Sequence, residues 1–378
     1  MSAVGTTAVE GTWMFREAAG ASDAVRAQLQ RDTAAIAAIG AEVRRLAPRA
    51  VITCARGSSD HAATYAKYLI ETRAGVLTAS AAPSISSIYG VSQDLRGCLF
   101  IALSQSGRSP DLLASVAAAR AAGATILALC NSPDSPLTAA ADWVIELRAG
   151  VETSVAATKS YLATLAALVR LVAAWTEDAA LESDLDGLPA LMDQSWALDW
   201  SAALPPLASA EHLYVVGRGL GLGAAQEIAL KCKETCGLHA EAFSSAELRH
   251  GPYALLGPGF PALLLAQRDA TRAGVEALSV ELARRGLTVM IAGAEDAGAQ
   301  AIGTQTIGTQ TIGAQAVSAQ TLGARGAGAI LLPAVEATAE IAPILLVQSA
   351  YRLITTLAIR RGFDPDRPAH LRKVTETV

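Results

Sequence analysis

A hydroxyl-rich turn follows one of the most apolar runs of the sequence. Residues 99–103 are apolar, and the next residues are Ser-Gln-Ser-Gly-Arg-Ser, followed by Pro110, which suits the first turn of a helix. Hydroxyl groups, a glycine that lets the backbone approach, and the free N–H groups of a helix N-terminus can together hold a phosphate. The alternative is a polar turn that only caps the helix. The candidate phosphate ligands are Ser104, Gln105, Ser106 and Ser109.

A second turn of similar composition follows the apolar run at residues 50–54. It reads Ala-Arg-Gly-Ser-Ser-Asp and contributes the candidates Gly57, Ser58 and Ser59. Two such turns at the carboxyl ends of neighbouring parallel strands would converge on one ligand. The Gly-Arg-Gly turn at 217–219 is a weaker signal, because a lone pair of glycines is common in turns.

The second half of the chain carries charged residues at helical spacing. Residues 223–236 have a helical pattern in which Glu227, Lys231 and Glu234 share one face. One interpretation is an ion pair between Glu and Lys on an exposed helix face. The other is a face that packs against the rest of the αβα sandwich. The segment 239–252 then contains His, Glu, Ser and Arg residues close together in the sequence. His250 in this segment is either a structural residue or a proton shuttle near neutral pH.

Alternation of short apolar runs with helical patterns predicts the elements that position these residues. Residues 12–46, 110–122 and 158–175 are expected to be helical. Such alternation is typical of parallel sheets covered by helices on both faces. We therefore expect an α/β fold of two tandem αβα sandwiches with parallel flavodoxin-like sheets. The predicted strands are residues 50–54, 99–103, 125–130 and 143–147, then 213–216, 261–266, 287–292 and 329–332.

These elements suggest an order of segments along the chain. We expect an N-terminal helical segment at 1–48, a first domain at 49–180, a second domain at 190–360, and a tail at 361–378 that closes the active site. The acidic stretch 177–189, with Gly187 and Pro189, is the predicted connection. A five-residue repeat occupies 298–325, which we interpret as an insertion in a surface loop rather than a short β-coil, and to which we assign no chemistry.

The composition excludes several classes of function. The chain has 378 residues, of which 52% are hydrophobic and 17% charged, enough for the cores of two domains at roughly 100–200 residues each. The net charge of −5 without a basic cluster argues against nucleic acid and membrane partners. The five cysteines form no CxxC pair, the histidines show no metal-ligand spacing, and no secretory signal opens the sequence. We expect a cytoplasmic protein with reduced cysteines and no metal.

Taken together, the motifs resemble the isomerase half of glucosamine-6-phosphate synthase and its glutaminase-free relatives, including glucosamine-6-phosphate deaminases of the double sugar isomerase (SIS) domain family. The similarity runs from about residue 14 to 378 and excludes the repeat. It is carried by the segments 56–59, 104–107, 130–133, 152–159, 217–219, 230–234, 239–241, 247–252 and 368–373.

The resemblance implies roles for individual residues. Glu234 matches the carboxylate that moves a proton between C1 and C2 of the sugar, and Lys231 matches an active-site lysine. His250 matches a histidine that assists ring opening and comes from the neighbouring subunit, which implies a homodimer. Lys373 matches a tail lysine that forms an imine with the sugar carbonyl. The substrate-binding matches are Gly57, Ser58, Ser59, Ser104, Gln105, Ser106, Ser109 and Val155.

Departures from the family pattern shape the expected reaction. Arg56 stands where the synthase has Cys, and Ala157 where it has Ser. The synthase also uses an N-terminal cysteine to liberate ammonia from glutamine, whereas Met1 is followed here by Ser2. We therefore expect deamination without a cofactor: glucosamine 6-phosphate and water would give fructose 6-phosphate and ammonia.

Several alternatives use the same motifs. They are a galactosamine-6-phosphate deaminase, a fructosamine-6-phosphate deglycase, a plain aldose–ketose isomerase, and a synthase served by a separate glutaminase chain. A sugar-phosphate-binding regulator is the alternative outside the enzymes. It is disfavoured because the region before Ala50 is one long helical pattern and not a helix-turn-helix, and because a regulator has no need of Glu234, His250 and Lys373 together.

Overall fold

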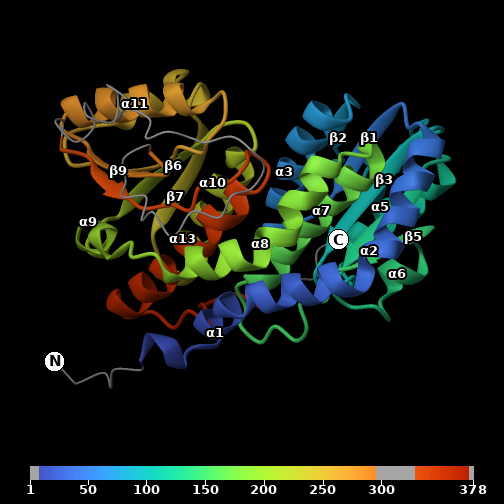
Figure 1. Ribbon diagram of the computed structural model, residues 1–378, viewed down its shortest axis with the longest axis horizontal. Coiled ribbons are helices and arrows are strands. Elements are labelled where there is room, and N and C mark those ends of the chain that lie inside the picture. The colour runs from blue at the N-terminus through green and yellow to red at the C-terminus, as the bar shows by residue number, and fades with distance from the viewer. Residues whose placement is uncertain (1–7, 295–327, 374–378) are drawn as a thin grey trace.

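The computed structural model describes residues 8–294 and 328–373 and contains two parallel five-stranded sheets (Figure 1). The first has the order β2-β1-β3-β4-β5 and the second β10-β9-β8-β6-β7. Each half thus repeats the same strand order, that of a flavodoxin-like sheet, and the predicted fold class is confirmed. The strands are β1 Ala50–Cys54, β2 Thr78–Ser80, β3 Cys98–Ser104, β4 Thr125–Cys130, β5 Trp143–Glu146, β6 His212–Gly217, β7 His239–Ser244, β8 Pro261–Leu265, β9 Thr288–Ala292 and β10 Ile330–Leu332.

The central strands are apolar on both faces because both faces are covered. Every residue of β3 is buried, and its Ile101 is in register with Thr53 of β1 and Leu127 of β4. A parallel sheet enclosed in this way has continuous apolar strands and no polar face. The carboxyl ends of β1 and β3 therefore lie side by side, and the turns that follow them meet at one edge.

A layer of long helices lies between the two sheets and belongs to both halves (Figure 1). One hydrophobic cluster joins residues of these helices to strands of each sheet. Smaller clusters lie on the outer faces, under α5 Pro110–Ala121 in the first half and α11 Arg272–Arg284 in the second. The helices of the middle layer are α2 Ala21–Leu46, α3 Ser58–Arg73, α7 Lys159–Thr176, α8 Ala179–Ala197, α10 Gly221–Cys236 and α13 Ala342–Arg360.

Short helices complete the described chain. At the beginning of the described chain, η1 and α1 contact α13, and the other short helices lie in the connections between longer elements. They are η1 Val9–Gly11, α1 Trp13–Ala19, α4 Pro83–Ser87, α6 Pro136–Ala139, η2 Ser201–Ala203, α9 Leu204–Ala208, η3 Glu247–Arg249 and η4 Pro252–Leu255.

Helices α3 and α10 cross at very short range. A Cβ added to Gly223 of α10 would lie 2.6 Å from the carbonyl oxygen of His61 and 3.1 Å from Cβ of Tyr65, both on α3. The crossing therefore requires glycine. It holds the first helix of each half together, next to the ends of β1 and β6.

The stretch predicted as a connection is itself helical. Helix α8 begins after Asp178, whose side chain accepts a hydrogen bond from the Leu181 N–H, and Pro189 lies inside it. Burial explains the helix, because Leu181, Leu185 and Leu188 lie on one buried side. The five-residue repeat at 298–325 lies outside the described residues.

One described helix has the length and hydropathy of a membrane span. It is α13, and 83% of the apolar stretch is buried inside the fold. That burial is typical of a core helix, and the position of α13 in the middle layer accounts for its composition.

Candidate active site

A cavity of about 220 Å³ opens where the two halves meet, at the carboxyl ends of β1 and β3. Residues of the first half, of helix α10 and of the tail line it together. Sugar-facing, phosphate-facing and catalytic candidates therefore share one space. The lining comprises Arg56, Gly57, Ser58, Ser59, Leu103, Ser104, Gln105, Ser106, Ser109, Leu112, Val155, Ala157, Lys231, Glu234, Leu371, Arg372 and Lys373.

The turn after β3 is shaped by its own hydrogen bonds. The Ser104 hydroxyl oxygen accepts from the Gly107 N–H at 2.9 Å. Gly107 has a φ of +65°, and a Cβ there would overlap the side chain of Ser135. Ser109 occupies the N-cap position of α5, but its side chain makes no capping hydrogen bond. Pro110 has no N–H, and the Leu112 N–H donates to Asp111 Oδ1 at 2.8 Å. The Ser109 hydroxyl and the Asp111 N–H are the groups at the start of α5 that could bind an anion.

The turn after β1 is tied both to the β3 turn and to α10. Gly57, with a φ of +56°, precedes the first turn of α3. Ser58 accepts a hydrogen bond from Lys231 Nζ at 3.0 Å. Arg56 lies 2.9 Å from the buried Asp111 carboxylate at the start of α5. The sequence indicated Arg56 only as a departure from the family, whereas the structure gives it a place in the cavity wall and joins the two turns through it.

Lys231 forms ion pairs with two carboxylates of its own helix. Its Nζ lies 2.5 Å from Glu234 Oε2 and 3.5 Å from Glu227 Oε1. Glu227 and Lys231 are both fully buried, and Glu234 is partly exposed to the cavity. The interpretation of these residues as an exposed pair is therefore wrong, because the shared face points into the middle layer.

The attraction between Lys231 and the two carboxylates offsets the free-energy cost of burying their charges. Burial alone would lower the pKa of Lys231, but the carboxylates of Glu227 and Glu234 outweigh it and the pKa is raised. Burial would likewise raise the pKa of Glu227, but the charge of Lys231 and hydrogen bonds from neighbouring side chains outweigh it and the pKa is lowered. Both groups are therefore charged at neutral pH.

The tail residue Lys373 is held against a loop of the first half. Its Nζ donates to the Ser154 carbonyl oxygen at 2.6 Å and to Glu152 Oε2 at 3.2 Å. Glu152 is buried and also accepts from the Ser160 hydroxyl at 2.7 Å. Sequence reasoning did not select Glu152 for a role, although it begins the 152–159 motif that carried the family resemblance.

The same loop is fixed from two further directions. The Glu17 carboxylate of α1 accepts from the N–H groups of Thr153 and Ser154. The Val155 N–H donates to the Asp366 carbonyl oxygen at 3.1 Å, which brings Val155 to the cavity wall. Asp366 also accepts from the Trp13 N–H at 2.7 Å. The loop is thus held between the N-terminal helix and the tail.

His250 is not brought to this cavity by its own chain. It follows η3 in the second half, is exposed to solvent, and is not among the lining residues. Eleven of the predicted site residues, all except His250, line the cavity. A contribution of His250 from a neighbouring subunit stays a prediction.

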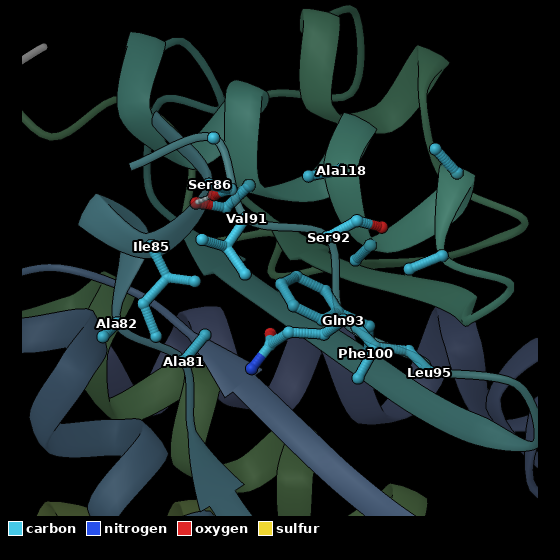
Figure 2. A pocket seen from close by; sticks show the side chains of 15 residues that line it. Ala81, Ala82, Ile85, Ser86, Val91, Ser92, Gln93, Leu95, Phe100 and Ala118 are labelled. Carbon is cyan, nitrogen blue, oxygen red and sulfur yellow. Dashed lines mark hydrogen bonds between the residues drawn. The ribbon is translucent and has the colours of Figure 1, made fainter. Parts of the chain in front are cut away.

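A second hollow of about 250 Å³ lies on the outer face of the first half, between α4 and α5 (Figure 2). Phe100, Ile85 and Val91 surround it, as Figure 2 shows, together with small and uncharged polar side chains. No charged side chain lines this hollow. It therefore lacks the cations that strengthen the binding of a phosphate, in contrast to the cavity between the halves.

The chemistry available in the cavity follows from these groups. Serine hydroxyls and two helix N-termini can bind an anion, Glu234 can accept or donate a proton, and the amine of Lys373 can attack a carbonyl. In the described parts of the chain, no three His, Cys, Asp or Glu side chains are grouped so as to hold a metal ion.

The model of the SIS domain family matches residues 47–174 and 206–304, more than half of the chain. This chain belongs to the SIS domain family. Glutamine–fructose-6-phosphate aminotransferase of Aeropyrum pernix is 32% identical over 84% of this chain and 49% of its own length. The chain thus spans about half the length of this curated relative.

Solved structures have the same architecture. A Silicibacter pomeroyi DSS-3 protein proposed to be a phosphosugar isomerase superposes with a TM-score of 0.82 and 35% identity, over 94% of this chain and all of that one. The C-terminal domain of glucosamine–fructose-6-phosphate aminotransferase from Francisella tularensis superposes with a TM-score of 0.78 and 25% identity, over 97% of this chain and all of that domain. These similarities are to enzymes of the phosphosugar isomerase type.

Proposed function

We propose that the chain is a cytoplasmic phosphosugar isomerase that deaminates an amino-hexose 6-phosphate, converting glucosamine 6-phosphate and water to fructose 6-phosphate and ammonia. The observation that carries this proposal is the meeting of Glu234 and Lys373 in a cavity with two serine turns. A base, an amine and an anion site are the groups this reaction needs. Five free, buried cysteines suit a reducing compartment.

In the first steps of the proposed mechanism, the phosphate lies at the serine turns and the open-chain aldehyde faces Glu234. Glu234 removes the proton from C2 and returns it to C1. O1 gains a proton and the C2 amine loses one, so the product has a hydroxyl at C1 and an imine at C2. Lys231, 2.5 Å from Glu234, stabilises the carboxylate between these transfers.

In the last steps the nitrogen leaves. The neutral amine of Lys373 adds to the C2 imine and expels ammonia, and water then hydrolyses the new imine to the ketone and the free lysine. Lys373 contacts Glu152 at 3.2 Å, so this carboxylate can take the proton that the lysine must lose first. Glu152 is thereby proposed as a positioning residue for Lys373.

We further propose a homodimer in which His250 of one subunit reaches the cavity of the other. His250 is exposed, and the nearby Leu255 is an exposed large apolar side chain, 70% accessible in the single chain. An imidazole beside the sugar ring could move the proton that ring opening requires. Apolar exposure next to a functional side chain is typical of an interface.

Ammonia release from a panel of amino-sugar phosphates tests the function. Glucosamine 6-phosphate, galactosamine 6-phosphate and a fructosamine 6-phosphate are each incubated with wild type, with Glu234→Gln, and with the control Glu241→Gln, whose carboxylate is exposed on β7. Removal of a general base lowers turnover by about 10² to 10⁴. We expect that loss in Glu234→Gln and wild-type rates in Glu241→Gln.

The other outcomes lead to different functions. Release from galactosamine 6-phosphate or fructosamine 6-phosphate alone would name those activities instead. No release, with aldose–ketose exchange of a simple sugar phosphate intact, would identify a plain isomerase. Faster synthesis than deamination at physiological ammonia would reverse the proposed direction. Binding without either reaction would point to a regulator.

A further inference from the structure

We propose that His61 and Tyr351 are positioning residues that act on the base Glu234 through Glu227 and Lys231. Neither residue lines the cavity. Each contacts the buried Glu227 from a different helix, and Glu227 competes with Glu234 for Lys231. The inference rests on the proposed function, because it assigns the effect to the residue proposed as the base.

Glu227 receives hydrogen bonds from two other helices of the middle layer. His61 Nδ1 on α3 lies 3.1 Å from Glu227 Oε2, and the Tyr351 hydroxyl on α13 donates to Glu227 Oε1 at 2.9 Å. Because an ionised carboxylate only accepts, His61 must donate through Nδ1. Glu227 has no solvent exposure, so protein groups alone stabilise its charge.

Lys231 is shared between two carboxylates and a hydroxyl. It lies 2.5 Å from Glu234, 3.5 Å from Glu227 and 3.0 Å from the Ser58 hydroxyl. The distance from Lys231 Nζ to Glu227 is the longest of the three, which is consistent with a Glu227 charge that His61 and Tyr351 already stabilise. Lys231 can therefore lie close to the base Glu234 and to Ser58 in the turn after β1.

Other titratable groups face this network and do not replace the two donors. Tyr161 of α7 and Glu152 lie close enough to act electrostatically on Glu227 and Lys231 respectively. Asp60, which precedes His61 on α3, also interacts electrostatically with His61. Among the described residues, the protein hydrogen bonds to Glu227 are those of His61 and Tyr351.

Removing either donor should draw Lys231 toward Glu227. An unsatisfied buried carboxylate is costly, and the nearest cation is the one that can move to it. Lys231 would then leave Glu234 and Ser58. With its cation farther away, Glu234 would lose the partner that holds it in position, and proton transfer would slow.

The kcat and KM for the substrate found above test this inference. His61→Phe keeps a ring and removes the donor, Tyr351→Phe removes only the hydroxyl, and His61→Asn keeps an N–H near the position of Nδ1. We expect kcat to fall about tenfold in both Phe variants, because Glu234 is no longer held in position. We expect His61→Asn to behave like wild type.

Controls separate positioning from general damage. His212→Phe changes an exposed histidine on β6 and should leave kcat unchanged. KM should change less than kcat in all variants, because the serine turn after β3 is not altered. Values of kcat in His61→Phe and Tyr351→Phe that equal wild type would overturn the inference, and so would a loss in His61→Asn as large as that in His61→Phe.

Failure of the proposed function is distinguishable from failure of this inference. If wild type turns over no sugar phosphate, the proposed function fails, and the network is tested by crystal structures of wild type, His61→Phe and Tyr351→Phe. We expect Lys231 Nζ to lie closer to Glu227 than to Glu234 in both variants. An unchanged position of Lys231 in both variants would overturn the inference without reference to activity.

Discussion

Lys373 lies in the tail outside any helix, and its partners Glu152 and Ser154 lie more than 200 residues earlier in the sequence. Lys373→Met removes the amine but keeps most of the side-chain volume. We expect ammonia release to fall at least about 10³-fold, because covalent catalysis has no other route here. Calorimetry should show binding of a sugar phosphate within a few-fold of wild type.

The matched control for Lys373 is Lys67→Met, an exposed lysine on α3. It should retain wild-type rates. Full ammonia release by Lys373→Met would contradict an imine with the lysine and would mean that water hydrolyses the C2 imine directly.

Lys231 should also matter to stability because its removal leaves a buried charge. Lys231→Met leaves the buried Glu227 carboxylate without a paired lysine. We therefore expect the free energy of unfolding at pH 7 to drop by about 3–5 kcal/mol. Lys231→Met/Glu227→Gln removes both charges and should recover much of that loss. Urea denaturation of wild type and both variants measures the difference.

The pH dependence of this loss has a defined sign. The pKa of Glu227 is lowered in the fold, so its contribution is present above its unfolded pKa and is lost as pH falls through its folded pKa. The pKa of Lys231 is raised, so its contribution is present below its unfolded pKa and is lost as pH rises through its folded pKa. The gap between wild type and Lys231→Met should narrow in acid; a gap that is constant from pH 4 to 8 would contradict the charge pairing.

Residue types alone indicated most of the cavity wall but not the partners of its charged groups. The serine turns were predictable because they follow apolar strands of one parallel sheet. The burial of Glu227 was not, since glutamate and lysine at helical spacing look the same on an exposed face. His61 and Tyr351 lie 166 and 124 residues from Glu227, and no local pattern relates them.

At the scale of elements, the crossing of α3 and α10 determines how the two halves meet. Gly223→Ala would push Cβ to within 2.6 Å of the His61 carbonyl oxygen. Alanine favours a helix over glycine by about 1 kcal/mol, but this clash should outweigh that gain and lower the melting temperature. It should also lower activity, because His61 and Gly57 lie at the same end of α3.

Gly187, a glycine in another helix, provides the matched control for Gly223. It lies in α8, it is exposed, and a Cβ there meets no atom within 4 Å. Gly187→Ala should therefore raise stability by up to about 1 kcal/mol. Equal melting temperatures for the two alanine variants would argue against a steric role of Gly223.

Strands were predictable where the sequence has an apolar run. Strands β1, β3, β4, β6, β8 and β9 coincide with such runs, and so do the edge strands β5 and β10. Strand β2 is short and mostly exposed, and β7 carries His239 and Glu241 at a sheet edge. These two edge strands were missed because an edge strand can be polar on its exposed side and then lacks the apolar run that marks a central strand.

At the scale of the whole molecule, the proposed dimer makes a quantitative prediction. If His250 serves the partner's cavity, a heterodimer of Glu234→Gln and His250→Asn subunits has one cavity with both defects and one with neither. Random exchange of subunits should then restore about a quarter of wild-type activity. The measurement is ammonia release after the two inactive variants are mixed and allowed to exchange.

Sedimentation should confirm exchange in the same mixture. No recovery of activity despite heterodimer formation would place His250 in its own chain's cavity or outside the reaction. This question could not be answered from sequence or from one chain, because the position of His250 relative to a cavity depends on a surface that a second subunit would cover.

The hydrogen bonds between the tail and the 152–155 loop determine when, during synthesis, the protein can become active. Lys373 donates to the Ser154 carbonyl oxygen across 219 residues of sequence, and Asp366 contacts both Val155 and α1. The first sheet can form during synthesis while its substrate loop still lacks those partners. The enzyme would therefore bind and turn over substrate only once residues 366–373 have left the ribosome, and a chain released just short of them would fold as an inactive protein.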